Sequence, residues 1–124
     1  MARLNKVGVG RARGFSLNTA NFFTTEDEIG YGEPISALTI GSHYVIDTSR
    51  NGVGPASDSE LKWCNPGGRA LGTPPTAATG GAHADAYLWI KRPGESDGTC
   101  DKGDPPAGTF VNQYATDLAR NAGQ

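Results

Sequence analysis

The alternation of apolar and polar residues predicts three β-strands. The first is expected over residues 14–18 (Gly-Phe-Ser-Leu-Asn) and the second over residues 43–47 (His-Tyr-Val-Ile-Asp). The third, over residues 85–91, has the clearest period of two, which is typical of a strand with two different faces. One face carries Ala86, Leu88 and Ile90, and the other carries Asp85, Tyr87, Trp89 and Lys91.

Two helices are predicted, one between the first two strands and one at the end of the chain. Thr25 and Glu28 have the spacing of a capping box, in which Thr25 accepts from the third amide and Glu28 reaches back. Pro34 removes an amide from this segment, so we expect a bent helix or two short ones, ending near Gly41. The last helix is expected over residues 109–120, where apolar side chains recur at helical spacing. These are Phe110, Val111, Tyr114, Ala115 and Leu118.

The order of these elements predicts an α/β fold with a parallel sheet. Strands that alternate with helices favour this class, and in such sheets functional residues gather beyond the carboxyl ends of the strands. The second strand is followed by Asp47 and Arg50. The third is followed by Lys91, Glu95 and Asp97. Three strands do not close a barrel, so we expect part of the sheet to lie uncovered in an isolated copy.

Composition and charge narrow the class of protein. The 124 residues suffice for one ordinary domain, and 18 Gly with 8 Pro indicate long loops around a small core. A formal charge of −2 excludes the basic surface that nucleic-acid or anionic-membrane binding needs. No apolar run is long enough to cross a membrane, and the first seven residues lack the apolar centre of a secretory signal.

The two cysteines leave two interpretations open. Cys64 and Cys100 lie 36 residues apart, which fits no zinc-ligand spacing. They form either a disulfide that joins two loops in an oxidising compartment, or two unlinked buried thiols.

The segment from Lys91 to Asp97 (Lys-Arg-Pro-Gly-Glu-Ser-Asp) is the candidate for chemistry. A carboxylate held near Lys91 and Arg50 stays ionised at neutral pH, because a neighbouring cation favours the charged form. Hydrolysis of a glycosidic bond with inversion uses two carboxyl groups, and an exposed indole such as Trp63 suits the apolar face of a sugar ring. The alternative is a solvated turn with surface ion pairs.

Three segments, in order, resemble the glycoside hydrolases of family 6. They are residues 43–52 (His-Tyr-Val-Ile-Asp-Thr-Ser-Arg-Asn-Gly), residues 60–72 (Glu-Leu-Lys-Trp-Cys-Asn-Pro-Gly-Gly-Arg-Ala-Leu-Gly) and residues 85–98 (Asp-Ala-Tyr-Leu-Trp-Ile-Lys-Arg-Pro-Gly-Glu-Ser-Asp-Gly). Residues 15–22 and 110–121 match as well, so the resemblance covers nearly the whole chain. The family comprises inverting endoglucanases and cellobiohydrolases, which implies a cellulase that acts on β-1,4-glucan or cello-oligosaccharides.

The resemblance implies roles for individual residues. Asp97 falls on the aspartate proposed as the catalytic base, an assignment that is disputed because this aspartate is salt-linked to cations. Arg50 and Lys91 fall on those cations. Lys91 and Glu95 fall on residues that hold the sugar just before the cut bond, and Trp63 falls on a tryptophan that stacks on glucose one subsite further.

Other implications concern the rest of the chain. Cys64 and Cys100 match a disulfide pair of the family, which favours the bridge and a secreted, extracellular protein. Trp89, in mid-strand, is expected to serve packing. The family domain is a distorted (β/α) barrel of parallel strands, more than twice this length, with long loops at the carboxyl ends. Residues 1–124 therefore correspond to a single partial domain, the C-terminal portion of that barrel.

Three hypotheses follow from this partial match. The general acid of the family lies in the N-terminal half, and no residue of 1–22 replaces it, so a non-catalytic glucan-binding fragment is the alternative to a cellulase. Two copies could also pair and cover each other's sheet. No metal or cofactor is expected, because His43 and His83 lie 40 residues apart without partners at ligand spacing. Asp85 is expected to be structural. Asp47 is expected to hold residues 48–52, with contact to the substrate as the alternative role.

Overall fold

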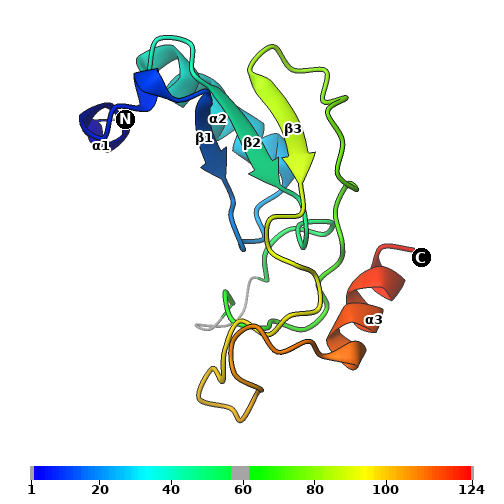
Figure 1. Ribbon diagram of the computed structural model, residues 1–124. Helices are drawn as coiled ribbons and strands as arrows, with labels where there is room; N and C mark the ends of the chain where they lie inside the picture. The colour runs from blue at the N-terminus through cyan, green and yellow to red at the C-terminus, as the bar shows by residue number, and fades with distance from the viewer. Residues whose placement is uncertain (1, 57–61, 124) are drawn as a thin grey trace.

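The computed structural model describes residues 2–56 and 62–123. Glu60 and Leu61, which begin the second of the three matching segments, lie outside the described residues. Figure 1 shows the sheet and α2 at one end and the long loops with α3 at the other. The elements, in chain order, are α1 (Ala2–Lys6), a 3-10 helix (Val9–Arg11), β1 (Gly14–Leu17), α2 (Thr25–Leu38), β2 (His43–Asp47), β3 (Ala84–Leu88) and α3 (Asn112–Asn121).

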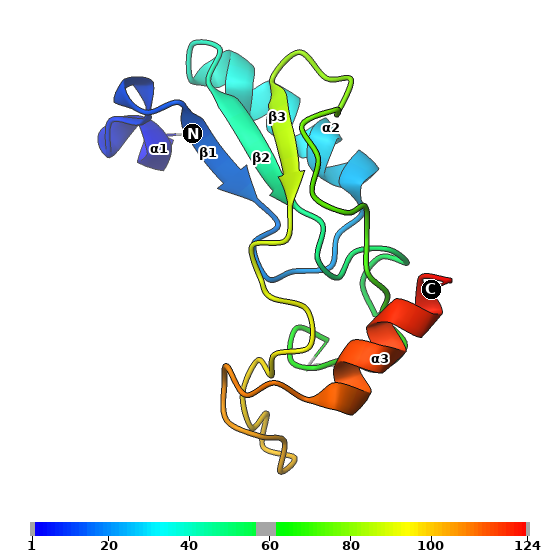
Figure 2. The ribbon, with the colours of Figure 1, turned by 45° about the vertical axis from the view of Figure 1, so that its right-hand side comes forward.

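The three strands form one parallel sheet in the order β1-β2-β3, as the sequence predicts. Gly14 pairs with His43 so closely that an added Cβ would collide with the His43 carbonyl oxygen, which explains the glycine at the start of β1. All three strands point toward the half of the molecule that holds the loops and α3 (Figures 1 and 2). Side chains that follow the strands are therefore brought to one end of the sheet.

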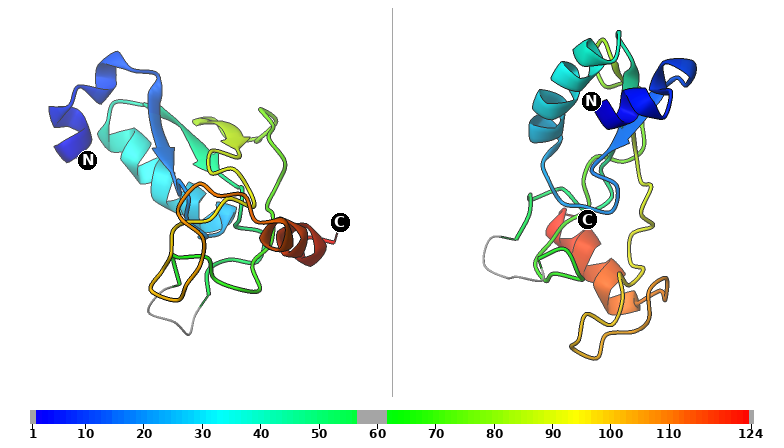
Figure 3. Two further views of the ribbon diagram at one scale, coloured as in Figure 1. Left: turned by 60° about the horizontal axis from the view of Figure 1, so that its bottom comes forward. Right: turned by 90° about the vertical axis from the view of Figure 1, so that its left-hand side faces the viewer.

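One face of the sheet packs against α2 and forms the core (Figure 3). The helix approaches closely at Gly32, where an added Cβ would lie 2.8 Å from a methyl carbon of Leu17. On the opposite face Val45 is half-buried and Leu88 is exposed. The sheet is therefore open, with its apolar contacts concentrated on the α2 side. The buried core residues are Leu17, Ile35, Tyr44, Ile46 and Ala84.

The helix α2 corrects two predictions. Its N-cap is Thr24, whose hydroxyl accepts from the Asp27 amide at 3.2 Å, whereas the Thr25 hydroxyl accepts from Asn51. The predicted capping box of Thr25 and Glu28 is therefore wrong by one residue at the cap. The predicted alternative of two short helices is also wrong, because one helix continues through Pro34. Pro34 is exposed, so water can replace the hydrogen bond that its missing amide would have made.

The ends of β3 and α3 also differ from the prediction. The strand was expected to reach Lys91 but ends at Leu88, because the Trp89 indole donates to the Thr73 carbonyl and the Lys91 amide turns to Asp47. The last helix was expected from residue 109 but begins at Asn112, because residues 109–111 pair with the loop of residues 94–96. The short helix α1 was not predicted.

Candidate active site

Arg50 is a fully buried charge, with a side chain that is 0% exposed. It follows β2 in the loop of residues 48–52, and its guanidinium carbon, Cζ, lies 4.3 Å from the centre of the Phe22 ring. One nitrogen donates to Asp97 Oδ2 at 2.7 Å and to the Tyr114 hydroxyl at 2.9 Å. The other terminal nitrogen donates to the Ala20 carbonyl at 2.6 Å. Arg50 thus joins the loop after β1, the loop after β3 and α3.

Asp97 lies between two cations, and its side chain is 8% exposed. Arg50 donates to Oδ2, and the Lys91 ammonium lies 3.1 Å from Oδ1. The backbone amide of Asn65 also donates to Oδ2, at 2.9 Å. Burial alone would raise the pKa of this carboxyl, but Arg50, the Asn65 amide and Lys91 outweigh it and hold the pKa below its ordinary value. Asp97 is therefore anionic at neutral pH.

The structure brings Arg50, Lys91 and Asp97 into direct contact, as the sequence predicts for the ends of the second and third strands. Glu95 is placed differently from these three. Its carboxylate pairs with Arg92 at 2.9 Å, and its backbone forms an isolated bridge with Phe110. Glu95 is half-buried, and within the part of the chain that the structure describes it makes no hydrogen bond or ion pair with Asp97 or Lys91.

Asp47 organises the backbone around the cluster, and its carboxylate is fully buried. One oxygen accepts from the Ser49 amide at 2.9 Å, which confirms the expected role in holding the loop of residues 48–52. The other oxygen accepts from the amides of Ala20, at 2.8 Å, and of Lys91, at 3.0 Å. Asp47 therefore connects the segments that follow all three strands.

An open pocket of about 460 Å³ lies at this end of the sheet. Asp97 and Lys91 line one part of it, and Trp63, with 56% of its surface exposed, lines another. Trp89, by contrast, is half-buried and hydrogen-bonded to Thr73, in keeping with its predicted packing role. The residues that line the pocket are Thr19, Ala20, Asn21, Trp63, Lys91, Ser96, Asp97, Ala107 and Gly108.

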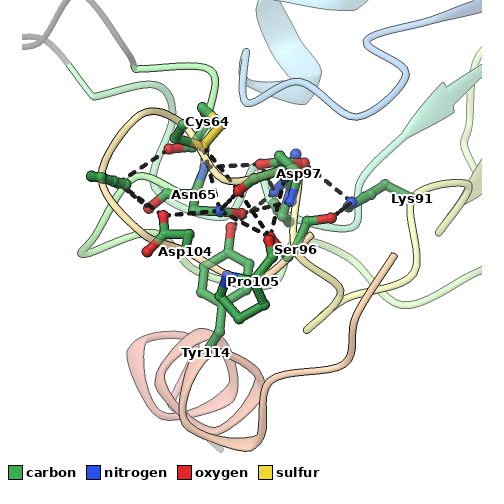
Figure 4. The surroundings of a disulfide bond; sticks show 12 residues. Cys64, Asn65, Lys91, Ser96, Asp97, Asp104, Pro105 and Tyr114 are labelled. Atoms are coloured by element: carbon green, nitrogen blue, oxygen red, sulfur yellow. Dashed lines mark hydrogen bonds and ion pairs between the residues drawn. A yellow bond between two sulfur atoms is a disulfide. The ribbon is translucent and has the colours of Figure 1, made fainter. Parts of the chain in front are cut away.

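The disulfide between Cys64 and Cys100 is present, with 6.0 Å between the two Cα atoms. Figure 4 shows it beside Asn65, Ser96 and Asp97, so the bridge lies next to the residues that surround the Asp97 carboxylate. The prediction of this bridge is confirmed. It joins the loop that carries Trp63 to the loop that carries Asp97.

Two residues of the site were missed by sequence reasoning. The Tyr114 hydroxyl accepts from Arg50, and burial raises its pKa. Asn65 forms hydrogen bonds with Asp97 through both its backbone amide and its side-chain oxygen. Tyr114 was assigned to the apolar stripe of α3, where its hydroxyl gives no periodic signal. Asn65 lies next to Cys64 and would have been found had the disulfide been treated as part of the site.

The opposite end of the sheet holds a second polar cluster. Asp85 pairs with Arg13 at 2.8 Å and with His43 at 2.7 Å, and these contacts lower the pKa of Asp85 to about 2. His83 pairs with Glu33 at 2.9 Å. The structural role expected of Asp85 is confirmed, and both histidines have carboxylate partners that their sequence spacing did not indicate. Within residues 2–56 and 62–123, no three His, Cys, Asp or Glu side chains are grouped for a metal ion.

The chemistry of the pocket follows from the charges on its wall. Asp97 Oδ2 is occupied by two donors, whereas Oδ1 has Lys91 alone and retains room for a further donor such as water or a sugar hydroxyl. The indole of Trp63 offers a flat apolar surface in the same pocket. The arrangement can bind a ligand with one apolar face and several hydroxyl groups, next to an anionic carboxylate.

In the part of the chain that the structure describes, no helix is both long and apolar enough to span a bilayer.

Comparison with known proteins gives consistent matches. Residues 1–122 match the profile of the family described as Glycosyl hydrolases family 6. Endoglucanase A of Cellulomonas fimi is 52% identical over 97% of this chain and 26% of the relative. The catalytic core domain of the cellobiohydrolase Cel6A from Chaetomium thermophilum superposes with a TM-score of 0.80 at 30% identity, over 96% of this chain and 43% of that one.

A second solved structure is closer in sequence. The endoglucanase Cel6 from Mycobacterium tuberculosis, in complex with methyl-cellobiosyl-4-deoxy-4-thio-β-D-cellobioside, is 79% identical and superposes with a TM-score of 0.97. The match covers 99% of this chain and 42% of that one. The chain thus spans about a quarter of the curated relative and about two fifths of the solved structures that it matches.

Proposed function

Because this chain belongs to the glycosyl hydrolases of family 6, we propose that it forms one wall of a cleft that binds and hydrolyses β-1,4-glucan. The observation that carries the proposal is the convergence of Arg50, Lys91 and Asp97 on one pocket that also exposes Trp63. In this proposal Trp63, Lys91 and Glu95 hold glucosyl units, and Asp97 activates or orients the hydrolytic water. Residues 1–124 act as one partial domain, the C-terminal part of a distorted (β/α) barrel.

The role of Asp97 follows from its charge and its free lone pair. Hydrolysis with inversion needs one carboxylate that acts on water and one carboxylic acid that protonates the leaving oxygen, about 6.5–9.5 Å apart. Asp97 is held in the ionised form, which suits the first role and not the second. Arg50 and Lys91 keep it ionised. The Lys91 ammonium also donates to the Ser96 carbonyl at 3.3 Å, which leaves its third N–H for a sugar hydroxyl.

The second carboxyl group is proposed to come from outside this pocket wall. Asp97 is the one acidic side chain among the described residues that line the pocket. The relative from M. tuberculosis is similar over 42% of its length, so the rest of a family 6 domain, or a second copy of this chain, would have to complete the site. The disulfide supports secretion into an oxidising compartment.

Two measurements test the proposal. Titration with cellotetraose should quench the tryptophan fluorescence of this chain in a saturable way, because Trp63 is exposed in the pocket. The chain should also replace the matching 42% of the M. tuberculosis endoglucanase and give a hybrid that releases reducing sugars from carboxymethyl cellulose. Asp97→Ala in the hybrid should abolish that release. Full activity of this variant would remove Asp97 from the mechanism, and absence of binding would overturn the glucan site.

A second candidate function is glucan binding without hydrolysis by this chain alone. It is favoured by the single acidic side chain that lines the described pocket, because an unassisted leaving group forfeits about 10²–10⁴ in rate. The same two assays separate the candidates. A binder quenches with cellotetraose and releases no reducing sugar, whereas a complete enzyme does both. Sedimentation at micromolar concentration shows whether two copies pair.

A further inference from the structure

We propose that Asn65 is the residue that positions the Asp97 carboxylate, and that the Cys64–Cys100 disulfide holds Asn65 in place. The inference deepens the proposed function and rests on it, because it concerns the same pocket. Nothing in the resemblance to family 6 assigned a role to Asn65. Its contacts in the structure are what single it out.

Asn65 and Asp97 hold each other through two hydrogen bonds that run in opposite directions. The backbone amide of Asn65 donates to Asp97 Oδ2 at 2.9 Å, and the backbone amide of Asp97 donates to the Asn65 side-chain oxygen, Oδ1, at 2.8 Å. The first bond fixes the carboxylate and the second fixes the backbone that bears it. Because both the carboxylate oxygen and the backbone amide of Asp97 are held by Asn65, the side chain has little freedom to rotate.

The remaining atoms of Asn65 anchor it to the loop of residues 96–104 (Figure 4). Its side-chain nitrogen lies 3.0 Å from the Gly98 carbonyl, 3.1 Å from Asp104 Oδ2 and 3.2 Å from the Ser96 hydroxyl. Its backbone has φ of +47°, a left-handed conformation that asparagine tolerates better than most residues. The side chain thus reaches three acceptors while the backbone amide points at Asp97.

The disulfide fixes this conformation from the preceding residue. Cys64 is fully buried, and its bond to Cys100 joins the loop of Asn65 to the loop of Asp97. The Cys100 residue itself has φ of +55°, next to Asp101 at +54°, so the chain turns sharply where the bridge is made. Without the covalent bond, the two loops would be held at this point by hydrogen bonds alone.

The consequence of this geometry is that the two oxygens of Asp97 differ. Oδ2 accepts from Arg50 and from the Asn65 backbone amide, whereas Oδ1 has Lys91 as its one partner among the described residues. In this proposal Asn65, together with Arg50, occupies Oδ2 and leaves Oδ1 as the oxygen with room for a ligand. Three other charged or titratable groups lie around this pair. Tyr114 shares the Arg50 nitrogen, Asp104 accepts from the Asn65 side chain, and Lys102 pairs with Asp104 and donates to the Asn65 carbonyl at 3.4 Å.

The test measures the ionisation of Asp97 directly. The full chain is labelled with ¹³C-aspartate, and the carboxyl resonance of Asp97 is followed by NMR against pH in wild type and in Asn65→Gly. Glycine accepts the positive φ and keeps the backbone N–H, so this substitution removes the side chain alone. We expect the measured pKa of Asp97 to rise by one unit or more, because without the side chain that anchors residue 65 its backbone N–H is no longer held against Asp97 Oδ2, and the carboxylate loses a donor that favours its charged form.

The matched control is Asn121→Ala, which removes an asparagine side chain that donates to the Arg69 carbonyl at 2.9 Å, at the end of α3. This variant should leave the Asp97 pKa as in wild type. An unchanged Asp97 pKa in a cooperatively folded Asn65→Gly protein would overturn the proposal, even if melting temperature falls, because lost stability alone does not move a carboxyl pKa.

A second measurement covers the case in which Asn65→Gly does not fold. In wild type, the Asp97 amide should exchange with solvent slowly, and reduction of the disulfide should speed it at least tenfold more than it speeds the Ile46 amide in β2. Equal acceleration of both amides overturns the proposal. These outcomes do not depend on sugar binding, whereas failure of wild type to bind cellotetraose defeats the proposed function and leaves the Asp97 measurements standing.

Discussion

The Nη1 atom of Arg50 lies 2.7 Å from Oδ2 of Asp97, and both side chains are almost fully removed from solvent. A buried cation that loses its partner is strongly destabilising, because its desolvation is no longer compensated. We therefore expect Asp97→Asn to lower the free energy of unfolding by about 3 kcal/mol. Urea denaturation followed by circular dichroism measures this change.

Asp117→Asn is the control for that experiment. Asp117 pairs with Arg120 at 3.5 Å on the exposed side of α3, and such a surface pair contributes about 0–1 kcal/mol. A loss in Asp97→Asn no larger than in this control would show that the Arg50 charge is compensated by its other partners, Tyr114 and the Ala20 carbonyl.

The two tryptophans should separate binding from stability. Trp63→Ala is expected to weaken cellotetraose affinity at least tenfold, about 1.4 kcal/mol, because it removes the exposed flat ring of the pocket. Its melting temperature should change little. Isothermal titration calorimetry measures the affinity, and thermal unfolding measures the stability.

Trp89→Phe is the matched variant, since it removes the indole nitrogen that donates to Thr73. It should lower the melting temperature and leave the affinity unchanged. The opposite assignment, with binding lost in Trp89→Phe and kept in Trp63→Ala, would contradict the placement of the sugar surface.

The disulfide should contribute substantially to stability. It closes a separation of 36 residues, and the chain-entropy estimate for such a loop is about 3–4 kcal/mol. The double variant Cys64→Ser/Cys100→Ser should therefore unfold at clearly lower urea concentration than the oxidised wild type. Thiol titration of the denatured wild type should find no free thiol before reduction and two after it; two thiols before reduction would contradict the bridge.

Stability should fall in acid partly through Asp85. Its hydrogen bonds with Arg13 and His43 lower its pKa to about 2, whereas an unfolded aspartate titrates near ~3.9. A carboxyl with a lowered folded pKa stabilises the protein above about pH 4, and this contribution is lost as the pH falls toward 2. Asp85→Asn should flatten the dependence of the urea midpoint on pH over this range.

Arg13→Gln tests the same pair from the other side. It removes the cation that lowers the pKa of Asp85 most strongly and should give a similar flattening between pH 4 and pH 2. Curves for both variants that run parallel to wild type would show that the ion pair is already absent in solution.

The fold was predictable where the pattern is local. Residues 43–47 and 14–17 alternate clearly, and the structure has strands there. The third strand ended early because Lys91 offers its amide to Asp47, a contact across 44 residues that no local period encodes. Pro34 does not break α2, although a helix break was predicted there as one alternative. The effect of a proline depends on whether the carbonyl that loses its hydrogen bond faces water.

The candidate site was predictable to the extent that charged residues follow parallel strands. Strand order alone brings Arg50 and Lys91 to one end of the sheet, and Asp97 follows in the same loop as Lys91. Asn65 and Tyr114 were not predictable in this way. Each bonds to the cluster from an element far away in sequence, so their contribution depends on the path of the long loops.

The shared oxygen of Asp47 limits how this domain can be altered. It accepts hydrogen bonds from the backbone amides of Ala20 and Lys91, and both of these residues line the pocket. A transplanted β1–α2 loop of different length would move the Ala20 amide and with it the Asp47 carboxylate. Because this carboxylate also holds the Lys91 backbone, the Lys91 ammonium would move away from Asp97. Loop grafts intended to change what the groove accommodates should therefore exchange residues 18–22 and 89–92 together, as a single cassette.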